Sequence, residues 1–272
     1  MAAKKIPQMT QAEIEQDIES ELERIKRRRN AEASGYYQIN DIEVESVDCA
    51  YAMEYAGLGM AYALHGDWDL AKEAFHTAAE YKIKPLLMAY SPEYPNFLGD
   101  ACTRGAQAID VVDCFNYAMA AGDLAIAKQA CGLFPAQWRP RNSKPGTADD
   151  FVHALHAWFS GDKIRAAGFC QKSMEAYIAK PSKKITGRSN YYTLHLALWG
   201  IIINDQSVFD TGIQKQLEIC HHEARYGEWK GMVEGHFAEY ALALTNLAIQ
   251  AGMKHQIIDP FIPEGLVWQQ PR

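Results

Sequence analysis

The feature that most constrains the fold of this chain is a short turn that occurs three times between alanine-rich segments. In each copy, apolar residues at helical spacing are followed by Gly-Asp, and an alanine lies four residues after the aspartate. Glycine readily takes the left-handed conformation that ends a helix, and aspartate caps the first free N–H groups of the next helix. The turns therefore predict antiparallel helical hairpins whose two helices approach closely at the alanine. They are Gly66-Asp67 with Ala71, Gly122-Asp123 with Ala127, and Gly161-Asp162 with Ala166.

The spacing of these turns indicates how the hairpins stack. The three glycines are 56 and 39 residues apart, whereas a tetratricopeptide array repeats about every 34 residues. We therefore expect an all-α chain built as an irregular stack of antiparallel helical hairpins. Two arrangements stay open, a tetratricopeptide-like α-solenoid and a compact helical bundle. No segment predicts a strand.

Helical periodicity and proline breaks divide the chain further. Residues 1–34 are expected to form an N-terminal amphipathic helix, with Thr10 and Glu13 as a capping box. Residues 35–272 are expected to form a single helical-hairpin domain with an extended C-terminal tail. Pro85 is expected to end the second helix of the first hairpin. The predicted helices span 10–29, 47–64, 68–81, 97–120, 124–133, 149–159, 163–178, 190–204, 205–226 and 230–251.

Bulk properties predict a cytoplasmic protein that does not cross a membrane. The longest apolar run, near residues 194–203, is interrupted by His195 and Gly200 and falls short of the roughly 20 residues that a membrane span needs. The charged first thirty residues lack the apolar core of a signal peptide. Six scattered cysteines without a CxxC pair indicate reduced thiols that pack as small core residues.

The net charge of −7 is unevenly distributed along the chain. Residues 31–110 carry four basic and thirteen acidic groups, whereas residues 111–272 carry sixteen basic and fifteen acidic groups. An acidic segment repels nucleic acid and attracts basic partners, although such a segment also serves solubility alone. The basic cluster 26–29 ends a helix and is too small to predict nucleic-acid binding.

Two groups of histidines raise the question of a metal site. His153 and His156 share a helix face with Asp149, and His221 and His222 are flanked by Cys220 and Glu223. Neither group matches a zinc motif such as HExxH, and adjacent histidines on a helix point about 100° apart. The chain also lacks a GxSxG motif and a glycine-rich phosphate loop. We therefore expect no metal, no cofactor and no catalytic residue, and predict that the protein is not an enzyme.

The layout resembles that of the immunity protein 49 family of bacterial polymorphic toxin systems. Three features carry the resemblance: the length of the helical chain, the hairpin motif at residues 118–123, and the closing stretch Ile258-Asp259-Pro260-Phe261-Ile262-Pro263-Glu264-Gly265-Leu266. It covers most of residues 45–268 and leaves out the N-terminal helix. The resemblance implies a protein without catalytic residues that binds a cognate toxin stoichiometrically in the cytoplasm of the producing cell.

Two function classes follow, and they differ in the partner. The first is an immunity protein that neutralises a cognate toxin, and the alternative is a helical-repeat adaptor or regulatory scaffold with no toxin partner. For the first we expect a toxin with a basic active-site surface; a homodimer is left open. The expected contact residues precede the first hairpin and are expected to be exposed. They are Tyr36, Tyr37, Asp41, Glu43, Glu45 and Asp48.

Overall fold

A computed structural model describes residues 8–102, 104–135, 147–182 and 184–269, and all regular structure within these ranges is helical. The predicted all-α class is confirmed. The α-helices are α1 (Gln11–Ala33), α2 (Tyr36–Ile39), α3 (Val44–His65), α4 (Trp68–Tyr90), α5 (Ala108–Ala121), α6 (Leu124–Leu133), α7 (Ala148–Phe159), α8 (Lys163–Ala179), α9 (Gly187–Ile203), α10 (Gln206–Tyr226) and α11 (Glu239–Gln250). Three 3-10 helices are η1 (Gly99–Ala101), η2 (Val233–His236) and η3 (Glu264–Leu266).

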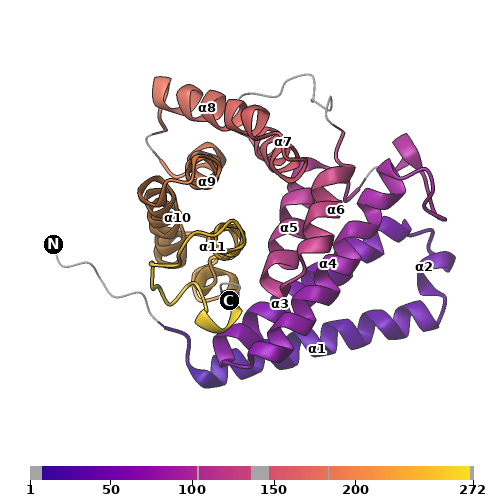
Figure 1. Ribbon diagram of the computed structural model, residues 1–272. Helices are drawn as coiled ribbons and strands as arrows, with labels where there is room; N and C mark the ends of the chain where they lie inside the picture. Colours follow the sequence, from indigo (N-terminus) through magenta and orange to yellow (C-terminus); the bar gives the residue numbers. More distant parts are fainter. Residues whose placement is uncertain (1–7, 103, 136–146, 183, 270–272) are drawn as a thin grey trace.

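The N-terminal helix α1 begins at the predicted capping box and lies along α3 (Figure 1). The Thr10 hydroxyl accepts from the Glu13 N–H, and the Glu13 carboxylate accepts from the Thr10 N–H at 2.7 Å. Near its C-terminal end, the Arg28 guanidinium donates to both carboxylate oxygens of Glu54 on α3. This largely buried ion pair fastens α1 to the rest of the chain. The domain boundary at residue 34 stays a prediction.

The three Gly-Asp turns have the predicted backbone. Gly66, Gly122 and Gly161 end their helices with φ of 99°, 90° and 82°, the left-handed region that glycine tolerates best. The alanines that follow, Ala71, Ala127 and Ala166, are fully buried. The small side chain of each alanine thus allows the two helices of its hairpin to approach closely.

The aspartates of these turns do not all act in the same way. Asp123 and Asp162 each accept a hydrogen bond at 3.0 Å from the N–H three residues later. Asp67 does not cap α4, because its carboxylate contacts Nδ1 of His65 at 2.7 Å. A fourth turn with a similar backbone but without the alanine, which the sequence analysis missed, follows α9. There Asn204 takes the left-handed conformation with φ of 55°, and Asp205 caps α10.

Pro85 does not end the first hairpin as expected. Helix α4 continues through it to Tyr90, although a proline inside a helix removes one backbone hydrogen bond. Pro85 is buried, and Gly105 approaches it so closely that an added Cβ would lie 2.8 Å from the proline ring. Tertiary contact on the proline therefore outweighs the local preference for a break.

Two predicted helices begin too early. In place of a helix from residue 97, the structure has η1 and then α5 from Ala108, because Gly99 and Gly105 both have positive φ. In place of a helix from residue 230, it has η2 and then α11 from Glu239, after Gly231 with φ of 77°. Left-handed glycines interrupt both segments.

The stack of hairpins curls back on itself. In Figure 1, α7 and α8 lead away from α5 and α6, α9 and α10 follow, and α11 returns to pack against α5. Asn246 on α11 donates to the main-chain oxygens of Met119 on α5 and of Leu266 in the tail. The indole N–H of Trp268 donates to the same Met119 oxygen at 3.0 Å. The tail, predicted to be extended, contains only η3 as regular structure in its described part and packs into this closure.

Candidate functional site

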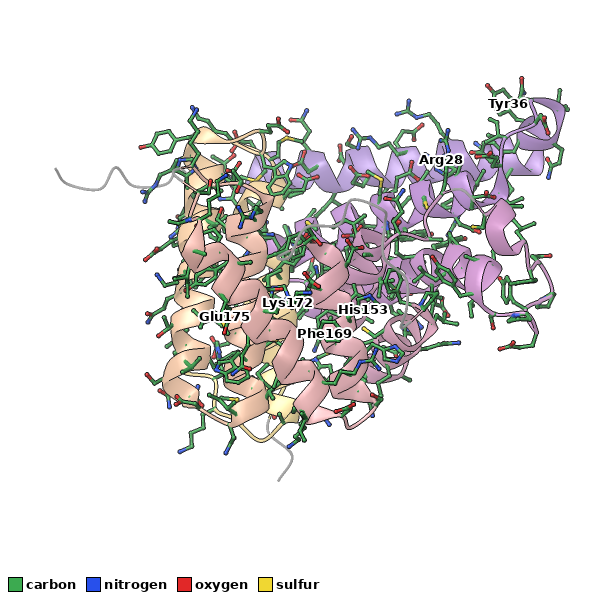
Figure 2. All side chains as sticks on the ribbon, turned by 90° about the horizontal axis from the view of Figure 1, so that it is seen from above. Arg28, Tyr36, His153, Phe169, Lys172 and Glu175 are labelled. Atoms are coloured by element: carbon green, nitrogen blue, oxygen red, sulfur yellow. The ribbon has the colours of Figure 1, made fainter. Side chains whose placement is uncertain are left out.

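The most exposed apolar surface near the predicted contact residues is a corner formed by α2 and the residues after it. We call residues 36–44 the α2 corner. Tyr36, Ile39 and Val44 are 50%, 79% and 59% exposed, and Asp41 and Glu43 lie exposed between them. Figure 2 shows Tyr36 at the outer edge of the molecule, beyond the Arg28 end of α1. Apolar side chains on a polar rim are typical of a surface that binds protein.

The structure divides the six predicted contact residues into two groups. Tyr36, Asp41 and Glu43 are exposed as expected, and Tyr37 is half-buried with its hydroxyl donating to the Arg28 carbonyl. Glu45 and Asp48 are buried, so the expectation that they are exposed is wrong.

Helix register explains why Glu45 and Asp48 are buried. Helix α3 begins at Val44, three residues earlier than predicted, so it contains Glu45 as well as Asp48, which the predicted helix already included. Three residues apart, they lie on one face of α3, where Asp48 is 3.5 Å from Nζ of Lys84 on α4. Burial raises the pKa of Asp48, although the lysine opposes this effect. Both side chains are therefore largely absent from the surface of the α2 corner.

Several acidic side chains of residues 31–110 form ion pairs within the fold. Glu54 pairs with Arg28, and Glu43 lies 3.3 Å from Nε of Arg104. Lys82, which is buried, lies 2.8 Å from Asp110 and 3.0 Å from Asp113. Of the two exposed acids of the α2 corner, Glu43 therefore has an ion-pair partner, and Asp41 has none among the described residues.

A groove of about 930 Å³ separates the basic end of α1 from α4 and α6. Lys26 and Arg29 of α1 and Lys84 of α4 line it together with Glu73 and Glu80 of α4. The Arg29 guanidinium donates to the Tyr55 hydroxyl. Because charges of both signs line this groove, it favours neither an anionic nor a cationic partner.

A second hollow, of about 540 Å³, lies on the inner side of the curled stack. We call it the inner cavity. It is bounded by α3, α10, the first turn of α9, η2 and the first turn of α11. Its apolar walls include Met60, Tyr117 and Phe237, and three carboxylates line it, those of Glu223, Glu234 and Glu239. Sequence reasoning missed this cavity because its walls come from segments that only the closure of the stack brings together.

Glu239 is the most perturbed carboxyl group of the inner cavity. It is the first residue of α11, and within the described part of the chain it has no hydrogen bond and no ion pair. Burial raises its pKa to about 8, and the negative charge of Asp113 adds to this effect. An ionised side chain at this position would be stabilised by a cation.

The two histidine groups have structural partners. His153 stacks on Phe169 with ring centroids 5.3 Å apart, and Figure 2 labels the two residues next to each other. His156 Nδ1 lies 2.9 Å from the Cys131 carbonyl. His221 Nε2 lies 3.1 Å from Asp259, and His222 lies 3.6 Å from Glu223. In the ranges that the structure covers, no group of three or more His, Cys, Asp or Glu side chains could hold a metal ion.

The cysteine side chains are poor candidates for nucleophiles. All six are free thiols, and three of them, Cys114, Cys131 and Cys170, are fully buried. Burial raises the pKa of Cys49 to about 11 and that of Cys220, in the wall of the inner cavity, to about 12. The thiolate is the reactive form of cysteine, so these two side chains are protonated at neutral pH.

Comparison with known proteins gives one match. The sequence model of a protein family described as immunity protein 49 matches residues 60–266. No curated protein and no solved structure matches the chain. The matched residues contain most of the inner cavity wall, whereas α1, the α2 corner and the first part of α3 precede them. Within the described residues, no helix is long and apolar enough to cross a membrane.

Proposed function

The chain belongs to the immunity protein 49 family, and from this premise we propose that it binds and neutralises a cognate antibacterial toxin by forming a stoichiometric complex. The family match carries the proposal, since it covers most of the chain. Stoichiometric inhibition requires a binding surface and no reaction. The protonated thiols of Cys49 and Cys220 and the partnered histidine groups agree with such a role.

We further propose that the α2 corner contacts the toxin. Tyr36 and Ile39 supply large exposed apolar side chains, and exposed aromatic residues often carry much of the binding energy at protein interfaces. Asp41 and Glu43 supply negative charge beside them. Opposed charges accelerate association, which favours capture of the toxin before it acts. A toxin surface that is basic around its active site would complement this corner.

The inhibitor must be in the same compartment as the toxin target. We propose that this compartment is the cytoplasm of the producing cell, where a toxin delivered by a neighbouring cell would act. The proposal agrees with the six free thiols, because the cytosol keeps cysteines reduced.

The test is co-expression with the toxin encoded beside this gene. The wild type is expected to protect cells and to form a one-to-one complex, which a titration of toxin activity against inhibitor concentration would show. Protection at a small fraction of one equivalent would instead indicate catalysis. If the wild type neither binds nor protects, the immunity function is wrong, and the adaptor alternative is preferred.

The contact surface is tested with two matched variants. The double variant Asp41→Ser/Glu43→Ser is expected to associate about tenfold more slowly at low salt, with a smaller difference at high salt. Tyr36→Ala is expected to weaken the complex by at least about 30-fold. The control is Glu175→Ser/Glu218→Ser, which removes the same charge from exposed positions on α8 and α10. Equal association rates for both double variants, with full affinity for Tyr36→Ala, would exclude the α2 corner.

A further inference from the structure

The inner cavity has the size and the walls of a ligand site. Its volume of about 540 Å³ lies within the range of roughly 300–1,000 Å³ that is typical of small-molecule pockets. Four aromatic side chains line it, those of Tyr117, Trp229, Phe237 and Tyr240. Amide groups of Asn190 and Gln216 add polar contacts. A ligand with an apolar or aromatic body would fit such walls.

The charged side chains that line the inner cavity are all acidic among the described residues. Glu223 of α10, Glu234 of η2 and Glu239 of α11 line it, and no lysine, arginine or histidine does so among the described residues. Glu239 has no partner in that part of the chain, as noted above. Glu239 is half-buried, so its ionised form is only partly hydrated and is stabilised by a nearby cation. The aromatic faces add to this preference, because they attract cations through their quadrupoles.

We propose that the inner cavity binds an organic cation, an ammonium or guanidinium group carried on an apolar body, with Glu239 as its counter-ion. The proposal does not depend on toxin binding. An anionic ligand would meet three carboxylates and no positive charge. A neutral apolar ligand would leave Glu239 without a partner and would gain nothing from the acidic lining.

The state of Glu239 predicts how such binding depends on pH. With a pKa of about 8, the carboxyl group is mostly protonated in the empty cavity at neutral pH. A bound cation favours the ionised form, so binding releases a proton and tightens as the pH rises toward 8. The groups that influence Glu239 from the surrounding elements are Lys82, Asp113, Tyr117, Tyr191, Cys220, Glu234 and Tyr240.

None of these groups replaces the missing cation. Burial acts to lower the pKa of Lys82, but Asp113 and Asp110 outweigh it and raise the pKa, so the lysine stays charged and is held by these two acids. Burial raises the pKa of Tyr117 and of Tyr240, so both remain neutral over the same pH range. The pH dependence is therefore assigned to Glu239.

The ammonium or guanidinium group has two sources, a free organic cation and a lysine or arginine side chain of a bound protein. The mouth of the cavity carries Met53, 67% exposed, and Trp229, 48% exposed. These side chains could contact the protein that donates such a side chain. The two sources are separated by competition, because a protein side chain would exclude the free amine and a free-amine site would not be affected by complex formation.

The experiment titrates the full chain with phenethylamine, 2-phenylethanol and 3-phenylpropionate, which share an aromatic body and differ in charge. Calorimetry and NMR are expected to show phenethylamine binding at least about tenfold more tightly than the neutral and anionic probes. Glu239→Gln is expected to bind phenethylamine at least about tenfold more weakly than the wild type. Its affinity should also no longer increase between about pH 6.5 and about pH 8. Glutamine has the shape of the protonated acid, so this variant should fold. The matched control Glu218→Gln removes an exposed charge of α10 outside the cavity and should bind like the wild type.

Three results would overturn the proposal. They are equal binding of the three probes, unchanged phenethylamine affinity in Glu239→Gln, and an equal loss of affinity in Glu218→Gln. If Glu239→Gln does not fold, Glu234→Gln in the same cavity must show the affinity loss, or the proposal is wrong. Repeating the titration with the toxin complex then assigns the source: loss of phenethylamine binding indicates a protein side chain, and unchanged binding indicates a free amine. The probe experiment needs no toxin, so its outcome is independent of the proposed immunity function.

Discussion

Replacing Gly200 with alanine should destabilise the protein, because α9 and α10 cross at this residue with almost no space between them. A Cβ at position 200 would lie 2.4 Å from the backbone nitrogen of Phe209 and 2.7 Å from its Cα. Gly212 on α10 faces Ala197 on α9 in the same way. A Cβ added at position 212 would lie 2.5 Å from the backbone nitrogen of Ala197. The colliding atoms belong to backbone, so the two helices must separate along their contact.

The expected magnitude follows from two opposing terms. Overpacking a close contact costs about 1–3 kcal/mol, and the backbone collision places Gly200→Ala near the upper end. Alanine is favoured over glycine within a helix by about 0.5–1 kcal/mol, which leaves a net loss of about 2 kcal/mol. The melting temperature should therefore fall by roughly 4–8 °C for a chain of this size.

Gly168 on α8 is the matched control for this prediction. It is also a helical glycine, but an added Cβ there would meet no atom within 4 Å. Gly168→Ala should raise the melting temperature by roughly 1–4 °C. Thermal and urea unfolding followed by circular dichroism measure both changes. A melting temperature of Gly200→Ala at or above that of the wild type would refute the close-crossing argument, as would destabilisation by Gly168→Ala.

Three further changes test other parts of the structure. Asp123→Ala should cost about 1 kcal/mol in urea unfolding because it removes a helix cap, whereas Asp67→Ala should cost less because Asp67 does not cap α4; equal losses would contradict this. Glu54→Ala leaves Arg28 unpaired and should accelerate hydrogen exchange in α1 more than in α5, and unchanged protection of α1 would contradict the role of this pair. Glu239 has a folded-state pKa of about 8, above its unfolded value, so its contribution to stability is present below about pH 4.5 and is lost as the pH rises toward 8. The free energy of unfolding of Glu239→Gln, relative to that of the wild type, should therefore be higher at pH 8 than at pH 5. The same difference at both pH values would contradict the raised pKa of Glu239.

The hairpin turns could be predicted from the sequence because their cause is local. Each turn is defined by three residues within a few positions of each other: a glycine with positive φ, the aspartate that follows it and a nearby alanine. The structure confirms the backbone of each turn. Asn204 was missed because asparagine takes the left-handed conformation less readily than glycine and so gives a weaker signal. Asp67 differs because a competing partner, His65, is available nearby.

The closure and both candidate sites depend on contacts that the sequence does not display. No local feature indicates that Asn246 meets Met119, and the inner cavity exists because α11 returns to α5. The α2 corner could be located from its charge and aromatic residues, but the burial of Glu45 and Asp48 could not. It follows from a helix start three residues earlier than predicted and from the face that α3 turns toward α4.

The return of α11 to α5 also governs how the chain folds. The hydrogen bonds that Met119 accepts join it to Asn246 and Trp268, which are 127 and 149 residues further along the chain. Such long-range contacts slow folding, since a large loop must close before they form. During synthesis the face of α5 that packs against α11 is made long before α11 can cover it. A nascent chain therefore carries an uncovered core surface until its last helix has left the ribosome, and it is open to aggregation or chaperone binding until then.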